Sequence, residues 1–179
     1  MARGRSVSGH GAGHWLHAVG AVQMLQMRPE EFVVASRLRL GMEQAVCRGC
    51  VCSCCGQTVD PQGHHYLICR GGELIARHDR ICRRVSVCVR AVADGVQTEV
   101  CGVLSGKKRV DVLYQDLGGQ VDLDVTVGMP TAAAYVGAAA SSDLGCANIK
   151  ERQKHRKYGA EAAAAGDRLL PWAVEAFGA

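Results

Sequence analysis

The sequence has no apolar run long enough to cross a membrane. A membrane-spanning helix needs about 20 consecutive apolar residues, and the alanine-rich stretches at 132–140 and 162–165 are much shorter. The N-terminus carries Arg3 and Arg5, but His17 and two glutamines interrupt the apolar stretch that follows them. We therefore expect no membrane association and no secretory signal, and we expect an intracellular protein.

Aromatic residues are also scarce, at 4% of the 179 residues, but 48% of the residues are hydrophobic and ten are cysteines. This composition favours a folded protein with one compact domain of about 100–150 residues plus an appendage. The formal charge of +4 is concentrated between Val46 and Arg90, where seven arginines face three acids. A local basic excess suits a polyanionic partner, although an ordinary solvated surface has the same composition.

The cysteines are unevenly distributed. Six of the ten lie in residues 47–69, whereas Cys82, Cys88, Cys101 and Cys146 stand singly among apolar residues and are typical of small buried hydrophobic side chains. A disulfide framework would need a secretory route, which the N-terminus does not indicate.

The cysteine-rich segment predicts a zinc site. Cys52 and Cys55 are separated by two residues, and His65 and Cys69 by three, which is the spacing of a zinc knuckle. Gly56 and Gly63 permit the tight turns of such a small loop. Four other potential ligands stay open as substitutes: Cys47, Cys50, Cys54 and His64. A second complete zinc site is not expected, because only one His/Cys group follows downstream.

The rest of the chain predicts an α/β protein in which a small mixed sheet is flanked by helices. Residues 1–13 are rich in glycine, serine and arginine and are expected to be disordered. A helix is expected from Pro29 to Gly41. Another follows from Leu74 towards Gly95, because its apolar residues recur every three or four positions. His78 lies on this apolar stripe, either as a hydrogen-bonded core histidine or as a catalytic group. Strands are expected at 96–104, at both ends of 109–127 and near 168–177, and a helix at 147–165.

Residues 109–127 carry aspartates within otherwise apolar strands. Pairing residues whose numbers sum to 235 places Val112 opposite Leu123 and makes one face wholly apolar. The same register places Asp111 opposite Asp124. Two facing carboxylates repel each other unless a cation lies between them, so the pair is a candidate Mg²⁺ site, and solvent exposure is the alternative.

Basic residues on the 147–165 helix could complete such a site. Lys150, Lys154 and Lys157 share one helix face, from which a lysine could reach a scissile phosphate. Taken alone, such a run is more typical of a wet surface.

Together these residues resemble the PD-(D/E)XK restriction-like endonucleases. More narrowly, the chain resembles the C-terminal region of reverse-transcriptase polyproteins of non-long-terminal-repeat retrotransposons, in which a zinc knuckle precedes such an endonuclease. The resemblance covers roughly residues 15–178 and rests on segments in the family's order, including "CCGQTVDPQGHHYLICRGG", "ARHD", "KKRVDV", "DLDVTV" and "KYG".

The resemblance implies a restriction-endonuclease-like αβββαβ core. It implies a disordered and helical segment at 1–45, a zinc knuckle at 46–73 and an endonuclease domain at 74–179. Asp111 and Asp124 would hold Mg²⁺. Thr126 stands where the commonest pattern has lysine, so Lys154 or Lys157 would take that role; Glu99 is a possible extra ligand. The zinc ligands would be Cys52, Cys55, His65 and Cys69. Duplex DNA, or RNA, would be bound by Arg77, Arg80, Arg83, Arg84, Lys107 and Lys108.

The expected function is Mg²⁺-dependent nicking of target DNA in the nucleus. A nucleic-acid-binding module without activity is the alternative that Thr126 favours, and a zinc-stabilised relic with no present task is a third. No strands with paired catalytic aspartates precede these segments, so we do not expect the chain to copy RNA.

Overall fold

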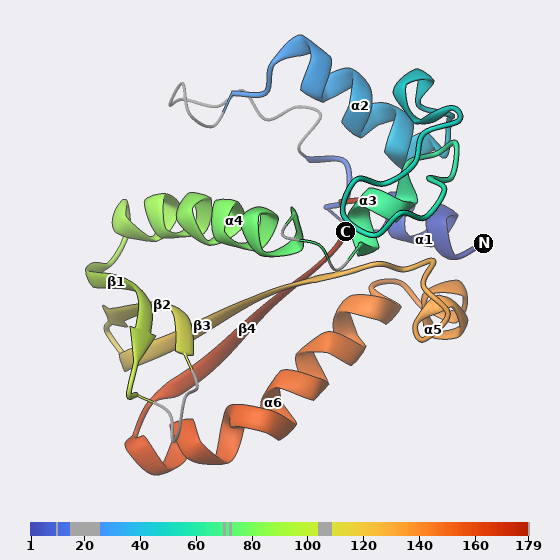
Figure 1. The fold of residues 1–179 in the computed structure, drawn as a ribbon. Coiled ribbons are helices and arrows are strands. Elements are labelled where there is room, and N and C mark those ends of the chain that lie inside the picture. The colour runs from blue at the N-terminus through green and yellow to red at the C-terminus, as the bar shows by residue number, and fades with distance from the viewer. Residues whose placement is uncertain (10, 15–25, 70, 72, 104–108, 179) are drawn as a thin grey trace. The chain divides into compact units, whose positions relative to one another are not determined.

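The computed structural model describes residues 1–9, 11–14, 26–69, 71, 73–103 and 109–178. The elements, labelled in Figure 1, are α1 (Ala2–Ser8), α2 (Pro29–Leu40), a 3-10 turn η3 (Ala45–Cys47), α3 (His64–Ile68), α4 (Glu73–Arg90), β1 (Asp94–Cys101), β2 (Arg109–Asp116), β3 (Gly119–Gly128), α5 (Val136–Ser141), α6 (Gly145–Ala165) and β4 (Arg168–Glu175).

The chain divides into two compact units. The first consists of residues 1–76, 128–146 and 174–179, and the second of residues 77–127 and 147–173. Each unit is therefore built from separate stretches of the chain.

The four strands form one sheet in the order β1-β2-β3-β4. The pairs β1–β2 and β2–β3 are antiparallel. Strands β3 and β4 are neighbours, and Ala176 N, just after β4, donates a hydrogen bond to Gly128 O at the C-terminal end of β3 (2.8 Å). The two strands therefore run in the same direction, which makes the sheet mixed. The predicted α/β class and the order of helix, three strands, helix and strand are confirmed. The short α5 between β3 and α6 was not predicted.

Two helices cover the sheet of the second unit, one on each face (Figure 1). On the α4 side, Cys82 packs with Val112, Leu123 and Val125. On the α6 side, Tyr158 and Ala162 pack with Val110 and Leu113. These apolar contacts fix both helices on the sheet, because burying each aliphatic side chain contributes about 1.5–3 kcal/mol.

Between Val112 and Asp116 the β2–β3 hairpin has the predicted register. The predicted pairing of Asp111 with Asp124 lies outside these pairs, because Asp111 contacts His78 of α4 and Asp124 contacts Lys154 of α6, on the other face of the sheet. Val112 pairs with Leu123, Leu113 with Asp122 and Asp116 with Gly119, so that Leu117 and Gly118 form the turn. Gly119 has φ +110°, a conformation that favours glycine. The Asp116 carboxylate also accepts a hydrogen bond from Gly118 N (2.8 Å) and closes the turn.

The first unit corrects the prediction of disorder at 1–13, because Ala2–Ser8 forms α1. Ala2 is buried against Ala139 and Cys146. Arg5 Nε donates to Ala140 O (2.8 Å), and the Arg39 guanidinium donates to Val7 O. Composition favoured disorder, but these contacts with distant segments hold the helix in place.

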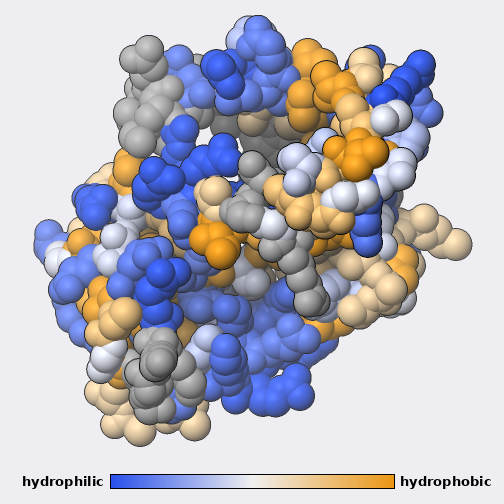
Figure 2. All heavy atoms as spheres, in the orientation of Figure 1, coloured by the Kyte–Doolittle hydropathy of each residue, from blue (hydrophilic) through white to orange (hydrophobic). Residues whose placement is uncertain are grey.

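Helix α2 begins at Pro29 and ends at Gly41, as predicted, and none of its residues is buried. Its apolar residues, such as Phe32 and Val33, are exposed. Apolar residues are interspersed with hydrophilic ones on the face of the molecule seen in Figure 2. Among the helices that the structure describes, none combines the length and apolar character needed to cross a membrane.

Candidate functional site

A small hairpin presents the first two cysteines of the predicted zinc site. Val51 bridges Thr58, Cys52 N donates to Gln57 O (2.8 Å), and Gly56 N donates back to Cys52 O (2.8 Å). Gly56 has φ +70°, which lets the chain reverse within this short loop. The Asp60 carboxylate accepts hydrogen bonds from His64 N and His65 N, and so holds the start of α3.

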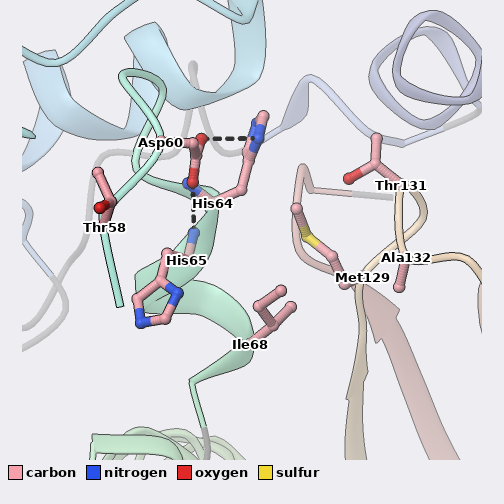
Figure 3. Close-up of a pocket in the computed structure, with 8 residues that line it drawn as sticks. All are labelled: Thr58, Asp60, His64, His65, Ile68, Met129, Thr131 and Ala132. Atoms are coloured by element: carbon pink, nitrogen blue, oxygen red, sulfur yellow. Dashed lines mark hydrogen bonds and ion pairs between the residues drawn. The ribbon is translucent and has the colours of Figure 1, made fainter. Parts of the chain in front are cut away.

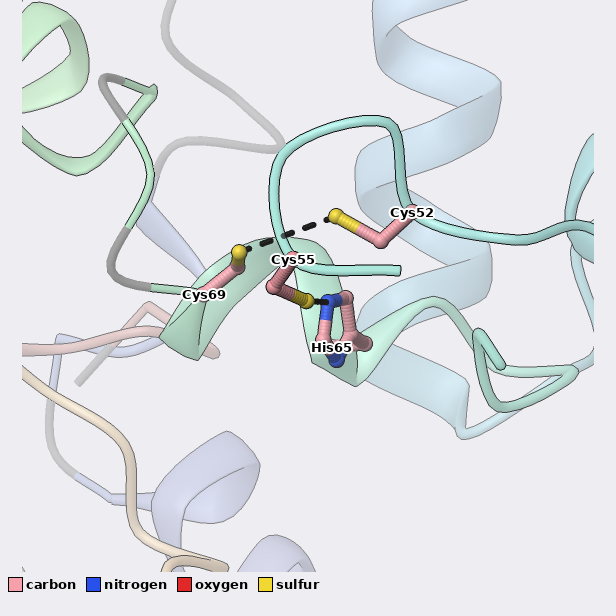
Figure 4. A group of neighbouring side chains, drawn as sticks. All are labelled: Cys52, Cys55, His65 and Cys69. Atoms are coloured by element: carbon pink, nitrogen blue, oxygen red, sulfur yellow. Dashed lines mark hydrogen bonds between the residues drawn. The ribbon is translucent and has the colours of Figure 1, made fainter. Parts of the chain in front are cut away.

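Four side chains converge beside this hairpin, as Figure 4 shows. The ligand atoms of Cys52, Cys55, His65 and Cys69 all lie within 4.8 Å of one another. The sulfurs of Cys52 and Cys69 are 3.7 Å apart, and Cys55 Sγ lies 3.2 Å from His65 Nε2. Bond lengths of about 2.0–2.3 Å around a tetrahedral ion imply ligand separations of roughly 3.4–3.8 Å. This Cys3His cluster could therefore hold a metal such as zinc.

The electrostatics of Cys52 suit a metal ligand. Backbone N–H groups of Cys54 and Cys55 donate hydrogen bonds to its sulfur and lower its pKa to about 6. The thiolate is the form of cysteine that binds metals, so Cys52 is deprotonated at neutral pH.

The four alternative ligands lie outside this cluster. Cys47 is buried against Cys52 and Cys69, and the Cys50 thiol donates to Val46 O (2.8 Å). Cys54 is exposed. His64 Nδ1 lies 3.1 Å from Asp60 Oδ2, and burial lowers its pKa.

A pocket of about 340 Å³ lies beside α3, and His65 of the Cys3His cluster is one of its lining residues (Figure 3). Ile68, Met129 and Ala132 supply apolar walls. The Asp60 carboxylate in this pocket already accepts hydrogen bonds from His64 N and His65 N and pairs with the His64 ring. Asp60 therefore has few lone pairs left to bind a ligand.

In the second unit, the predicted carboxylates are buried on neighbouring strands. Asp111 on β2 and Asp124 on β3 are each 6% exposed. Asp124 Oδ2 lies 2.6 Å from Lys154 Nζ on α6. Burial raises the pKa of Asp124 and the charge of Asp111 raises it further, whereas Lys154 lowers it. The structure thus pairs Lys154 with Asp124, whereas Asp111 acts on Asp124 through its charge.

Lys157 lies differently. It is exposed, and its Nζ is 4.7 Å from the centroid of the Tyr158 ring. Of the two lysines proposed for the same role, Lys154 is the one in contact with a carboxylate.

Asp111 is engaged on the α4 side. Its Oδ2 accepts a hydrogen bond from Val125 N (2.8 Å) and lies 3.2 Å from His78 Nε2. The hydrogen bond to Asp111 raises the pKa of His78 to about 11. The same nitrogen is 3.3 Å from Val125 O. His78 is therefore a half-buried imidazolium bound to the sheet.

The sequence predicts that Asp111 shares a metal site with Asp124, but in the structure Asp111 clusters with other potential metal ligands. Among the described residues, the second cluster with ligand atoms within 4.8 Å of one another consists of His78, Cys82 and Asp111, and Asp124 is not a member. The apolar stripe predicted on α4 includes His78 but not Cys82, and it does not show that Asp111 lies opposite them.

The predicted phosphate-binding residues on α4 divide into two kinds. Arg80, Arg83 and Arg84 are exposed, whereas Arg77 is partly buried, which lowers its pKa. Lys107 and Lys108 lie outside the described residues. Glu99 forms a half-exposed ion pair with Arg109 (2.7 Å).

Comparison with protein-family models, curated proteins and solved structures finds no match, so the function has to be inferred from these residues alone.

Proposed function

We propose that the chain is a metal-dependent DNA endonuclease whose reactive centre is formed by Asp111, Asp124 and Lys154. The observation that carries the proposal is the contact between Lys154 Nζ and Asp124 Oδ2, with both side chains largely shielded from water. A partly buried lysine paired with a buried carboxylate is an arrangement that solubility alone does not require. The element order around it is the one implied by the resemblance to restriction-like endonucleases.

The donor set fits a hard divalent cation. Asp111 and Asp124 supply carboxylate oxygens from rigid neighbouring strands, and their mutual repulsion favours a bound cation. Mg²⁺ bound there would polarise the scissile phosphate and lower the pKa of a bound water. Lys154 contacts Asp124 from α6, so its ammonium group would stabilise negative charge on a phosphate bound beside Asp124.

The remaining parts serve substrate binding. Arg80, Arg83 and Arg84 are exposed on α4 and suit contacts to DNA or RNA phosphates, which position the substrate without reading its sequence. Zinc in the Cys3His cluster would brace a segment that has little apolar core of its own. A DNA target places the proposed activity in the nucleus.

A plasmid nicking assay with Mg²⁺ or Mn²⁺ tests the proposal. Asp111→Asn and Asp124→Asn should each lower the nicking rate at least about 100-fold, because each removes an anionic oxygen from the reactive centre. Asp116→Asn is the matched control, since Asp116 lies at the turn of the same hairpin and should leave nicking within about threefold of wild type. Nicking that survives in both centre variants contradicts the proposal.

A nucleic-acid-binding module without cleavage is the second candidate. It is favoured by the contacts of Asp111, whose Oδ2 is already engaged by His78 and by Val125 N. Salt-dependent DNA binding with no nicking under any divalent metal selects this alternative.

A further inference from the structure

His78 and Cys82 on α4 meet Asp111 on β2, and of these three residues the proposed cleavage uses Asp111 alone. Cys82 Sγ lies 3.6 Å from His78 Nδ1 and 3.7 Å from Nε2, and Asp111 Oδ2 lies 3.2 Å from Nε2. Cys82 is 3% exposed and Asp111 6%. One imidazole, one sulfur and one carboxylate are therefore gathered at a largely buried point.

One ligand atom from each of the three side chains lies within 4.8 Å of the other two, so small side-chain movements bring all three around one ion. The Cys82 sulfur lies almost equally far from both imidazole nitrogens, so the His78 ring has to turn to point Nε2 at that ion. The donor types also select the ion. Thiolate and imidazole are soft or borderline ligands that suit Zn²⁺ and not Mg²⁺.

The helix supplies this pair of ligands by its geometry. His78 and Cys82 are one turn apart, so their side chains lie on the same face of α4, and that face is packed on the sheet. Asp79 stands beside them, with its Oδ1 3.5 Å from His78 Nδ1. At this distance Asp79 Oδ1 forms no hydrogen bond with His78, but its charge lies on the Nδ1 side of the ring and leaves Nε2 for the ion.

We propose that His78, Cys82 and Asp111 form a second metal site, which takes a borderline divalent cation of the Zn²⁺ class and releases the protons of His78 Nε2 and the Cys82 thiol to solvent as it binds. Three protein ligands leave the fourth position for water or for the Val125 carbonyl oxygen, which lies 3.3 Å from His78 Nε2. The site is independent of the proposed cleavage, although it uses the same Asp111. Residue spacing alone predicts one zinc site, because the third ligand here comes from a distant strand.

Zinc content after dialysis tests this site without any activity readout. The wild-type chain should retain two equivalents of zinc, one in the Cys3His cluster and one here, and Cys82→Ser should retain one. Cys88→Ser is the matched control, because Cys88 is exposed on the same helix, and it should retain two. Cobalt in place of zinc gives a second readout, since Cys82→Ser should lose one part of the thiolate-to-cobalt absorption.

Asp79→Asn separates a metal site from a simple ion pair. This variant should keep the cobalt absorption, but its affinity for the second zinc ion should fall about 10–100-fold, because the negative charge beside His78 is lost. If Cys82→Ser fails to fold, His78→Gln must lose the second equivalent instead. Retention of only one equivalent by the wild type, or of two by a folded Cys82→Ser or His78→Gln variant, overturns the proposal.

Discussion

Asp122 on β3 is a fully buried carboxylate, and neither of its oxygens has a hydrogen-bond partner in the part of the chain that the structure describes. It pairs with Leu113, whose side chain packs against Tyr158 and Ala162 of α6. Burial, together with the smaller effect of the nearby Asp167, raises the pKa of Asp122 to about 6. Ionised Asp122 is thus a local source of instability at neutral pH.

Asp122→Asn should stabilise the protein at pH 7.5 by about 2 kcal/mol in urea unfolding, because the buried charge is removed. The folded protein keeps this proton up to about pH 6, whereas the unfolded chain releases it near pH 4. Wild-type stability therefore falls as the pH rises through that window, and the advantage of the variant should disappear near pH 4.

Asp116→Asn is the control for this pH dependence. The pKa of Asp116 is lowered by the backbone N–H of Gly118 and by Arg168, so its ionised form is favoured by folding. Its substitution should reduce stability at pH 7.5 and have less effect at low pH. An Asp122→Asn variant that is less stable than wild type at pH 7.5 contradicts the account of Asp122.

For single residues, the sequence shows which aspartates are unusual, but it does not show which side chains they contact. Asp111 and Asp124 could be predicted because charged residues interrupt apolar strands. Their contacts with His78 and Lys154 could not, because they depend on where α4 and α6 dock on the sheet. Cys82 has the signature of a buried hydrophobic residue and does lie in the core, so nothing local distinguishes it as a ligand.

At the scale of elements, periodicity predicts the second unit well. The three-to-four-residue spacing on α4 and the alternation on β2 and β3 report which face is buried, and packing then fixes the hairpin register. The same reasoning fails for α1, because its seven residues have no apolar stripe and are held by Arg39 and by Ala140 O.

Helix α4 should also control how DNA binding depends on salt. Each phosphate contact steepens the dependence of log K on log salt by about 0.9 for duplex DNA. Replacing Arg80, Arg83 and Arg84 together with glutamine should reduce this slope by about 2–3 and weaken binding equally on unrelated sequences.

Fluorescence anisotropy with two duplexes at several salt concentrations measures both quantities. A matched triple replacement of Arg28, Arg37 and Arg48, which lie elsewhere in the chain, should change the slope less. A slope unchanged by the α4 replacement would show that these arginines do not contact phosphates.

At the scale of the whole molecule, the proposed reactive centre depends on contacts between residues far apart in the sequence. Asp111 and Asp124 come from two strands, and Lys154 comes from a helix about 30 residues later. The resemblance leaves Lys154 and Lys157 equivalent, since both lie near "KYG". Only the folded chain distinguishes them, because Lys154 contacts Asp124 and Lys157 lies over the Tyr158 ring.

Comparison of Lys154→Gln with Lys157→Gln in the plasmid nicking assay tests the central claim most directly. Both variants remove one positive charge from α6, so their effects on general DNA attraction are matched. We predict that Lys154→Gln lowers the nicking rate at least about 100-fold, because charge stabilisation at the phosphate is lost, while Lys157→Gln stays within about threefold of wild type. Equal rates for the two variants, or a larger loss in Lys157→Gln, would contradict the account.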